Sequence, residues 1–223
     1  MKEPEFWEDI ISDVPVCVDF VNNWKAIYNE LKKYLEGEGN YSLFDYPKIR
    51  VPDVENADQQ TALYSGSSWK ITSVGIAPDS SLTAWGGKFI EDYVMNKFGM
   101  TMEEAMKTIK PSLPLIQSIC SSLESEKKIF NSFVSILSPG THIAPHRGDS
   151  SLMRVHLGLV CDPECYIQVG DKRRVWKPGE LIAFKDGGPY PHSVQHNGTR
   201  DRWILSFDLT LDYLKTIIDH PML

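Results

Sequence analysis

The sequence has few of the features that mark secreted, membrane-spanning or disulfide-rich proteins. Its 223 residues contain only four cysteines, Cys17, Cys120, Cys161 and Cys165, which are too few and too scattered for a disulfide framework or a four-cysteine metal site. No apolar run approaches the ~20 residues that cross a bilayer, and the acidic start MKEPEFWEDI does not resemble a signal peptide. We expect a soluble, cytoplasmic protein with reduced thiols and no membrane partner.

Basic charge is also in short supply. The formal net charge is -7 and the pI is about 5.4, whereas nucleic-acid-binding domains usually carry a basic patch or a high pI. No nucleic-acid partner is therefore expected. The length and a hydrophobic content of 42% suffice for one sizeable domain, so we predict a single domain over residues 1–223. The sequence does not indicate the oligomeric state.

Residues 1–130 are predicted to form a mainly helical or irregular flanking part. Apolar residues recur at helical spacing between 22 and 36, and Gly37 follows them. Further helices are expected over 88–96, from Thr101 onward and over 115–123, with a short strand at 69–74. The segments 64–69 and 79–85 are candidate walls of a substrate pocket.

The pattern changes in the second half, where residues 131–212 read as the core of a β structure. Short β runs are separated by Gly, Pro and Asp at 133–137, 152–160, 165–169, 175–176, 181–184, 193–195 and 203–209. Seven or eight closely spaced strands favour a jelly roll or a small barrel. The expected fold class is mainly β with flanking helices (α+β).

Polar side chains gather on one face of two of these strands. Because side chains alternate along a strand, Arg154 and His156 share a face, and Arg202 and Asp208 share one on the last strand. Burying two guanidinium groups without anionic partners would be costly. A bound dianion would compensate them; ion pairs of the arginines with Asp208 or Asp149 are the alternative.

The histidines of this region suggest a metal site beside such an anion clamp. Imidazole is the commonest protein ligand of iron, zinc and copper, and His146 and His192 lie in or beside the predicted strands. His142 is expected to be structural because Gly140 and Pro145 exclude a helical histidine pair. His196 is expected to face solvent.

Four segments together resemble a known family. They are SILSPGTHIAPHRG (135–148), MRVHLGLV (153–160), RRVWKPGELIAFKDGGPYPHSV (173–194) and RWILSFDL (202–209). Their ordered combination of PGTH, PH-x-G, R-x-HLGL and a His followed ten residues later by an Arg is similar to the aspartyl/asparaginyl β-hydroxylase family. Members of this family are Fe(II)- and 2-oxoglutarate-dependent dioxygenases. The resemblance implies a double-stranded β-helix, the cupin-like form of the jelly roll.

The resemblance also implies an iron centre with few protein ligands. His146 and His192 would ligate Fe(II), leaving positions for a bidentate 2-oxo acid and for O2. Many related oxygenases add a carboxylate two residues after the first histidine, but Gly148 stands there, as is usual in the resembled family. Asp149, one residue farther along, is a weaker candidate ligand, and water is the expected occupant.

The cosubstrate site follows from the same resemblance. Arg202 would hold the distal carboxylate of 2-oxoglutarate, assisted by the hydroxyl of Ser135, because a guanidinium binds a carboxylate bidentately. Arg154 and His156 would lie at the metal end and contact the proximal carboxylate or the substrate. Asp208 and Asp186 are candidates to orient a neighbouring histidine or arginine; for Asp186, capping of the turn at Gly187-Gly188-Pro189 is an equal alternative.

The predicted function is hydroxylation of a C–H bond by a dioxygenase with His146, His192 and Arg202 as its catalytic residues. The family favours the β-carbon of an Asp or Asn residue, or of a related free, peptidyl or carrier-linked amino acid, and a related branch acts on lipid acyl chains. A small molecule or short peptide is the expected partner. The alternative is a non-catalytic cupin-like domain that binds a small molecule or serves as a scaffold.

Overall fold

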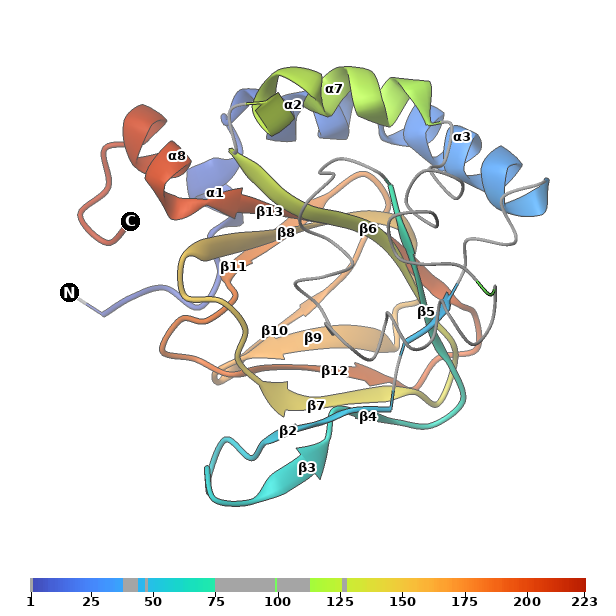
Figure 1. The fold of residues 1–223 in the computed structure, drawn as a ribbon, viewed down its shortest axis with the longest axis vertical. Helices are drawn as coiled ribbons and strands as arrows, with labels where there is room; N and C mark the ends of the chain where they lie inside the picture. Colours follow the sequence, from blue (N-terminus) through green and yellow to red (C-terminus); the bar gives the residue numbers. More distant parts are fainter. Residues whose placement is uncertain (1, 38–43, 47, 75–98, 100–112, 126–127) are drawn as a thin grey trace.

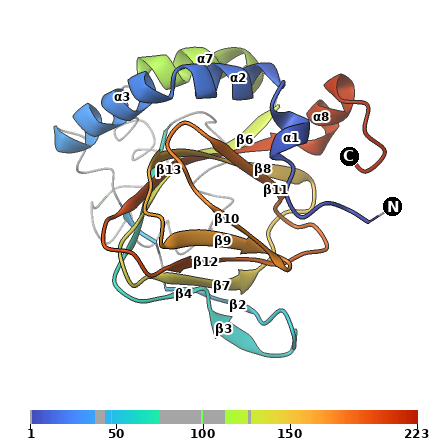
Figure 2. The ribbon, with the colours of Figure 1, turned by 180° about the vertical axis from the view of Figure 1, so that it is seen from behind.

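Two antiparallel sheets face each other and enclose the centre of the molecule (Figures 1 and 2). The computed structural model describes residues 2–37, 44–46, 48–74, 99, 113–125 and 128–223. The six-stranded sheet contains, in spatial order, β1 (Phe44–Asp45), β5 (Trp69–Ser73), β6 (Ile129–Leu137), β13 (Arg202–Thr210), β8 (Leu152–Val160) and β11 (Leu181–Lys185). The five-stranded sheet contains β10 (Lys172–Val175), β9 (Cys165–Val169), β12 (His192–His196), β7 (His142–His146) and β4 (Tyr64–Ser65).

The path of the chain between the sheets defines a jelly roll. From β6 onward the chain alternates between the two sheets, except at the β9–β10 hairpin, and all pairings are antiparallel. Strands β2 (Arg50–Pro52) and β3 (Gln60–Ala62) pair separately in a hairpin beside the five-stranded sheet (Figure 1). The predicted fold class, mainly β with flanking helices in a cupin-like jelly roll, is confirmed.

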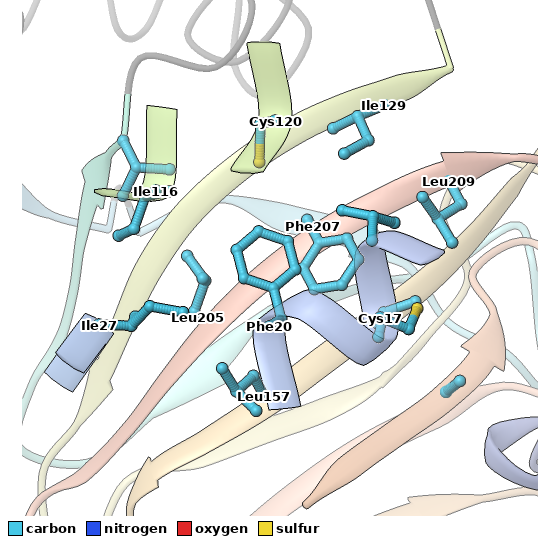
Figure 3. Close-up of a cluster of buried hydrophobic side chains, with 14 of the residues drawn as sticks. Cys17, Phe20, Ile27, Ile116, Cys120, Ile129, Leu157, Leu205, Phe207 and Leu209 are labelled. Atoms are coloured by element: carbon cyan, nitrogen blue, oxygen red, sulfur yellow. The ribbon is translucent and has the colours of Figure 1, made fainter. Parts of the chain in front are cut away.

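Helices cover the outer face of the six-stranded sheet. They are α2 (Pro15–Asn22), α3 (Trp24–Glu36) and α7 (Pro114–Ser125), while α1 (Glu8–Ile11) and α8 (Leu211–Ile217) lie near the chain ends (Figure 1). The stripe of α3 buries Ile27, Leu31 and Leu35, as its periodicity predicts. Phe20 of α2 packs against Phe207 of β13, with ring centroids 4.7 Å apart (Figure 3). No helix among the described residues is both long and apolar enough to cross a membrane.

Two hydrophobic clusters result from the alternation of side chains. Val155, Leu157 and Leu205 belong to the cluster between helices and sheet, whereas Phe184 and Ile204 belong to the cluster between the two sheets. The outward set of β8 and β13 is therefore apolar. The inward set carries the polar side chains, which places Arg154, His156 and Arg202 in the interior.

Several element boundaries differ from the sequence prediction. Strands β8 and β9 have the predicted bounds, and β6, β11, β12 and β13 extend one to four residues farther. Strand β10 ends at Val175, before the Trp176 that the prediction included. Strands β1 to β4, β7 and helices α1, α2 and α8 were not predicted. The helices expected over 88–96 and from Thr101 lie outside the described residues.

Candidate active site

A cavity of about 340 Å³ lies between the two sheets. This volume falls within the range of sites that hold small ligands. Its lining includes all six residues that were predicted from the sequence to bind the metal or the cosubstrate: Ser135, His146, Arg154, His156, His192 and Arg202. These residues come from β6, β7, β8, β12 and β13, so the fold brings together side chains that are far apart in the sequence.

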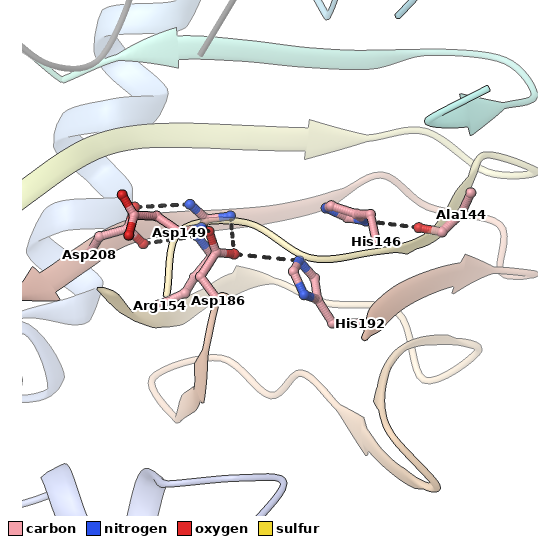
Figure 4. A network of polar contacts seen from close by, with 7 residues as sticks. All are labelled: Ala144, His146, Asp149, Arg154, Asp186, His192 and Asp208. Carbon is pink, nitrogen blue, oxygen red and sulfur yellow. Dashed lines mark hydrogen bonds and ion pairs between the residues drawn. The ribbon is translucent and has the colours of Figure 1, made fainter. Parts of the chain in front are cut away.

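The two candidate metal ligands face each other across neighbouring strands. His146 ends β7, His192 begins β12, and the two are cross-strand partners with ring centroids 4.1 Å apart. Nδ1 of His146 lies 2.8 Å from the Ala144 carbonyl oxygen (Figure 4). Since a carbonyl only accepts, Nδ1 carries the proton and donates it there, which leaves Nε2 of His146 with a free lone pair.

Both imidazoles are held in the neutral form. Burial lowers the pKa of His146. Burial, and then the neighbouring His146, lower the pKa of His192 well below the usual histidine value. A histidine must be neutral to bind a metal, so the pair is prepared for ligation. Within the part of the chain that the structure describes, no three His, Cys, Asp or Glu side chains are grouped to hold a metal ion.

The carboxylate next to the histidine pair belongs to Asp186, which directly follows β11. Its Oδ1 lies 3.5 Å from Nε2 of His192, and its Oδ2 accepts a hydrogen bond from the Asp149 amide at 3.1 Å. The Asp149 side chain is exposed, and its Oδ1 accepts from the amide and hydroxyl of Ser151 at 2.7 and 2.6 Å. Asp186, rather than Asp149, is therefore placed to assist a metal site.

Arg154 has anionic partners inside the protein. Its Nε and Nη2 donate to the two oxygens of Asp208 at 2.9 Å each, and its Nη1 lies 2.7 Å from Oδ1 of Asp186 (Figure 4). Burial by itself would lower the pKa of Arg154, but the two carboxylates raise it. The alternative of an internal ion pair with Asp208 is thus observed for Arg154, and no ion pair joins it to Asp149. Asp208 and Asp186 orient this arginine, as expected.

Arg202, unlike Arg154, is buried without a carboxylate partner among the described residues. It is 2% exposed, its Nη2 donates to Ser135 Oγ at 2.7 Å, and its guanidinium lies 4.8 Å from the centroid of the Trp176 ring. Its Nε has no hydrogen-bond partner, and no ion pair joins it to a carboxylate of the described residues. Burial lowers the pKa of Arg202. A buried guanidinium without a counter-charge is costly and favours binding of an anion.

Ser135 and His156 border this cationic end of the cavity. Ser135 Oγ also accepts from Nε1 of Trp69 at 2.9 Å, and because it accepts twice, its own proton is free to be donated to a ligand. His156 is buried, its Nδ1 has no hydrogen-bond partner, and burial, Arg202 and Arg154 lower its pKa well below the usual value. Both side chains can therefore contribute polar contacts to a bound anion.

Other residues that line the cavity were not predicted from the sequence. Tyr46, Ile49, Val51 and Leu63 form part of the wall, and the short strands around them gave no clear periodicity. Trp69, within the predicted wall segment 64–69, does line the cavity, while 79–85 lies outside the described residues.

The prediction that His196 faces solvent is wrong. His196 is fully buried, its Nε2 lies 2.9 Å from the Arg200 carbonyl oxygen, and its Nδ1 accepts from the Gly198 amide at 3.3 Å. His142 is structural, as expected, since its Nδ1 accepts from the His196 amide. Neither histidine contributes to the cavity lining.

Comparison with known proteins shows the family. The family profile of aspartyl/asparaginyl beta-hydroxylase matches residues 21–211. The chain belongs to this family. The relatives in this family are described as hydroxylases. The match extends well upstream of the four segments that carry the resemblance and includes helices α3 and α7 in full.

Individual relatives differ in how much they share with the chain. The mouse aspartyl/asparaginyl beta-hydroxylase is 36% identical over 77 residues, which are 34% of this chain and 10% of the mouse protein. The ornithine lipid ester-linked acyl 2-hydroxylase of Rhizobium tropici is 24% identical over 168 residues, 74% of this chain and 54% of the relative. The region matched to this chain is therefore about a tenth of the length of the mouse protein and about half of the length of the Rhizobium protein.

Solved structures resemble the chain only loosely. A protein described as a predicted oxalate decarboxylase from Thermotoga maritima has a TM-score of 0.37 and 14% identity, covering 66% of this chain and 84% of its own. A cupin domain from Enterobacter cloacae has a TM-score of 0.32 and 16% identity, covering 38% of this chain and 84% of its own.

Proposed function

We propose that the protein is an Fe(II)- and 2-oxoglutarate-dependent dioxygenase that hydroxylates a C–H bond of a small molecule or short peptide. The observation that carries the proposal is the buried Arg202, which has Ser135 beside it and no carboxylate partner among the described residues. A dicarboxylic 2-oxo acid supplies the missing anion. Its distal carboxylate would accept from Arg202 and from the Ser135 hydroxyl.

The histidine pair fits a metal that has only two protein ligands. His146 and His192 are neutral, adjacent and on the cavity wall, and neutral imidazole suits Fe(II). The bound iron would activate O2 at the expense of the 2-oxo acid, which becomes succinate and CO2. Asp186 would orient a group at the remaining positions by accepting a hydrogen bond from it.

Arg154 has a different part in this proposal from the one the sequence suggested. Because Asp208 and Asp186 already compensate its charge, Arg154 would mainly hold Asp186 in place beside His192. Contact of Arg154 and His156 with the proximal carboxylate stays a prediction. So does the β-carbon of Asp or Asn as the site of hydroxylation.

Formation of succinate from 2-oxoglutarate under air with added Fe(II) tests the proposal. His146→Ala and Arg202→Ala should each reduce it at least about 100-fold, since each removes a part that the reaction needs. His142→Ala, on the same strand as His146, and Arg173→Ala, exposed on β10, are matched controls that should retain activity. A native protein that binds neither Fe(II) nor 2-oxoglutarate would instead indicate a non-catalytic barrel.

A further inference from the structure

A stacked pair of aromatic rings forms part of the cavity wall at the end where Ser135 lies. Tyr46 directly follows β1, and its backbone amide donates to the Trp69 carbonyl oxygen at 2.7 Å. The two rings are nearly parallel, with centroids 3.8 Å apart and an interplanar angle of 7°. Both side chains are 5% exposed, and both line the cavity. Tyr46 therefore packs against the face of an indole ring that is itself part of the site.

Trp69 reaches Ser135 from the neighbouring strand. Strand β5 pairs with β6 (Figure 1), and Trp69 lies opposite Leu137, which follows Ser135 by two residues on the same face. Nε1 of Trp69 donates to Ser135 Oγ at 2.9 Å, and Arg202 donates to the same oxygen at 2.7 Å. A hydroxyl oxygen has two lone pairs. With both lone pairs engaged, Ser135 can only donate to a ligand, which favours an acceptor such as a carboxylate.

The hydrogen bond from Trp69 depends on the orientation of the whole indole ring. Its N–H group cannot rotate separately from the ring, and hydrogen bonds weaken steeply when donor and acceptor are misaligned. Two neighbouring rings restrict the indole: Tyr46 covers its face, and Tyr64 makes an edge contact at 5.5 Å and 90°. The Tyr64 hydroxyl also donates to the Tyr46 carbonyl oxygen at 2.7 Å. This bond fixes the backbone of Tyr46, and the Tyr46 ring in turn fixes Trp69.

We propose that Tyr46 is a positioning residue for the cosubstrate. Its ring holds the Trp69 indole at the angle that makes Ser135 a donor to the distal carboxylate of 2-oxoglutarate. The inference rests on the proposed function, which places that carboxylate beside Ser135 and Arg202. The contact with Trp69 is made by the face of the Tyr46 ring and not by its hydroxyl. Phe at position 46 should therefore replace Tyr, whereas Leu, which cannot stack, should not.

The orientation of Trp69 can be tested without iron or cosubstrate. Exchange of the Trp69 indole proton with solvent is measured by NMR in the metal-free protein, and the signal is identified by its absence in Trp69→Phe. Tyr46→Leu should accelerate this exchange about two- to tenfold, and Tyr46→Phe should leave it near the native rate. The matched control is Tyr28→Leu, which removes the aromatic neighbour of Trp203 in the cluster between helices and sheet. An exchange rate that Tyr46→Leu leaves unchanged overturns the proposal.

Two ligands that differ in the distal carboxylate test whether the effect reaches the cosubstrate. N-oxalylglycine, a non-reactive analogue of 2-oxoglutarate, and oxamate share the oxalyl group, but oxamate has no distal carboxylate. Their binding is measured by titration calorimetry with Fe(II) under nitrogen. Tyr46→Leu should weaken N-oxalylglycine about two- to tenfold and leave oxamate unchanged, while Tyr46→Phe and Tyr28→Leu should keep the native affinity for both. Equal losses for the two ligands, or the same loss in Tyr46→Phe as in Tyr46→Leu, overturn the proposal.

A double-mutant cycle with Ser135→Ala tests whether Tyr46 acts through Ser135. Once the hydroxyl is absent, Tyr46→Leu should have little further effect on the affinity for N-oxalylglycine, because changes that act through one shared contact are not additive. Additive losses would show an independent role of Tyr46 and overturn the positioning role. Failure of the proposed function has a different signature: the native protein would not bind N-oxalylglycine, although Tyr46→Leu still accelerates exchange of the Trp69 proton. That result would overturn the cosubstrate role together with the dioxygenase function.

Discussion

A Cβ atom on Gly148 would lie 1.7 Å from Oδ2 of Asp186. The carboxylate of Asp186 therefore occupies the space into which a side chain at position 148 would project. Many related oxygenases carry a metal-binding carboxylate at that position of the sequence. In this protein the carboxylate reaches the same region from the end of β11, and Arg154 holds it there at 2.7 Å.

Substitution of Gly148 should therefore be destabilising in a way that depends on Asp186. Gly148→Ala forces the carboxylate aside, and overpacking of this kind costs about 1–3 kcal/mol of unfolding free energy. Asp186→Ala removes the obstructing group, so the double variant should be more stable than the sum of the two single changes predicts. Urea denaturation of the four proteins measures the coupling. Additive changes would show that Asp186 does not fill this space.

Loss of Asp208 should be among the most damaging single changes in the barrel. Asp208 is fully buried and makes two hydrogen bonds to Arg154, and removing one partner of a buried pair costs about 3–5 kcal/mol. We expect Asp208→Ala to lie near the lower limit, because Asp186 still compensates part of the charge. Glu180→Ala, which breaks the exposed pair with Lys177, should cost less than about 1 kcal/mol. Chemical denaturation measures the loss of unfolding free energy in the two variants, and similar losses would contradict the prediction.

Period-two alternation predicted two of the strands that carry the site, β8 and β13, because both are long and have one apolar and one polar face. Alternation also determined which side chains share the interior. It could not determine the partners of Arg154, because Asp208 becomes its cross-strand neighbour only through the register of β13 on β8. Asp186 approaches from a third segment, the end of β11.

Strand β7 escaped prediction for a related reason. Its five residues, His142–His146, include Pro145 and show no strict alternation, and long-range pairing with β12 and β4 holds it in the sheet. The solvent-facing prediction for His196 is wrong because the turn after β12 brings the Arg200 carbonyl oxygen and the Gly198 amide into hydrogen-bonding distance of its ring. Local sequence does not encode such contacts.

The buried histidines should make the metal-free protein less stable as the pH falls from about 7 to about 5.5. The pKa of His156 is held well below the usual value, chiefly by burial, and the pKa of His196 is lowered by burial as well. Below about pH 6.5 the unfolded chain binds protons that the native protein excludes, so the unfolding free energy decreases, by up to about 1.4 kcal/mol per pH unit for each group. Above that pH, each neutral histidine makes its full contribution to the free energy of unfolding.

Urea denaturation at several pH values, with EDTA present to remove metal, measures this dependence. His156→Leu should reduce the slope, because it removes one of the groups that bind protons only on unfolding. A slope that His156→Leu leaves unchanged would contradict the assignment of His156 as a buried neutral imidazole.

The hypothesis of a carboxylate clamp predicts that Arg202→Lys impairs cosubstrate binding although it keeps the charge. The guanidinium lies 4.8 Å from the centroid of the Trp176 ring and donates to Ser135, and Lys offers neither a planar group nor paired donors. Loss of a charge-assisted hydrogen bond, about 1.5–3 kcal/mol, corresponds to a rise of about 10- to 150-fold in the KM for 2-oxoglutarate. The change in kcat should be much smaller, since the contact is made equally in the ground state and the transition state. Steady-state succinate formation and calorimetric binding of 2-oxoglutarate measure the two effects, with the exposed Arg173→Lys as the matched control. A selective loss of kcat at constant KM would place the role of Arg202 in the chemical step and not in the clamp.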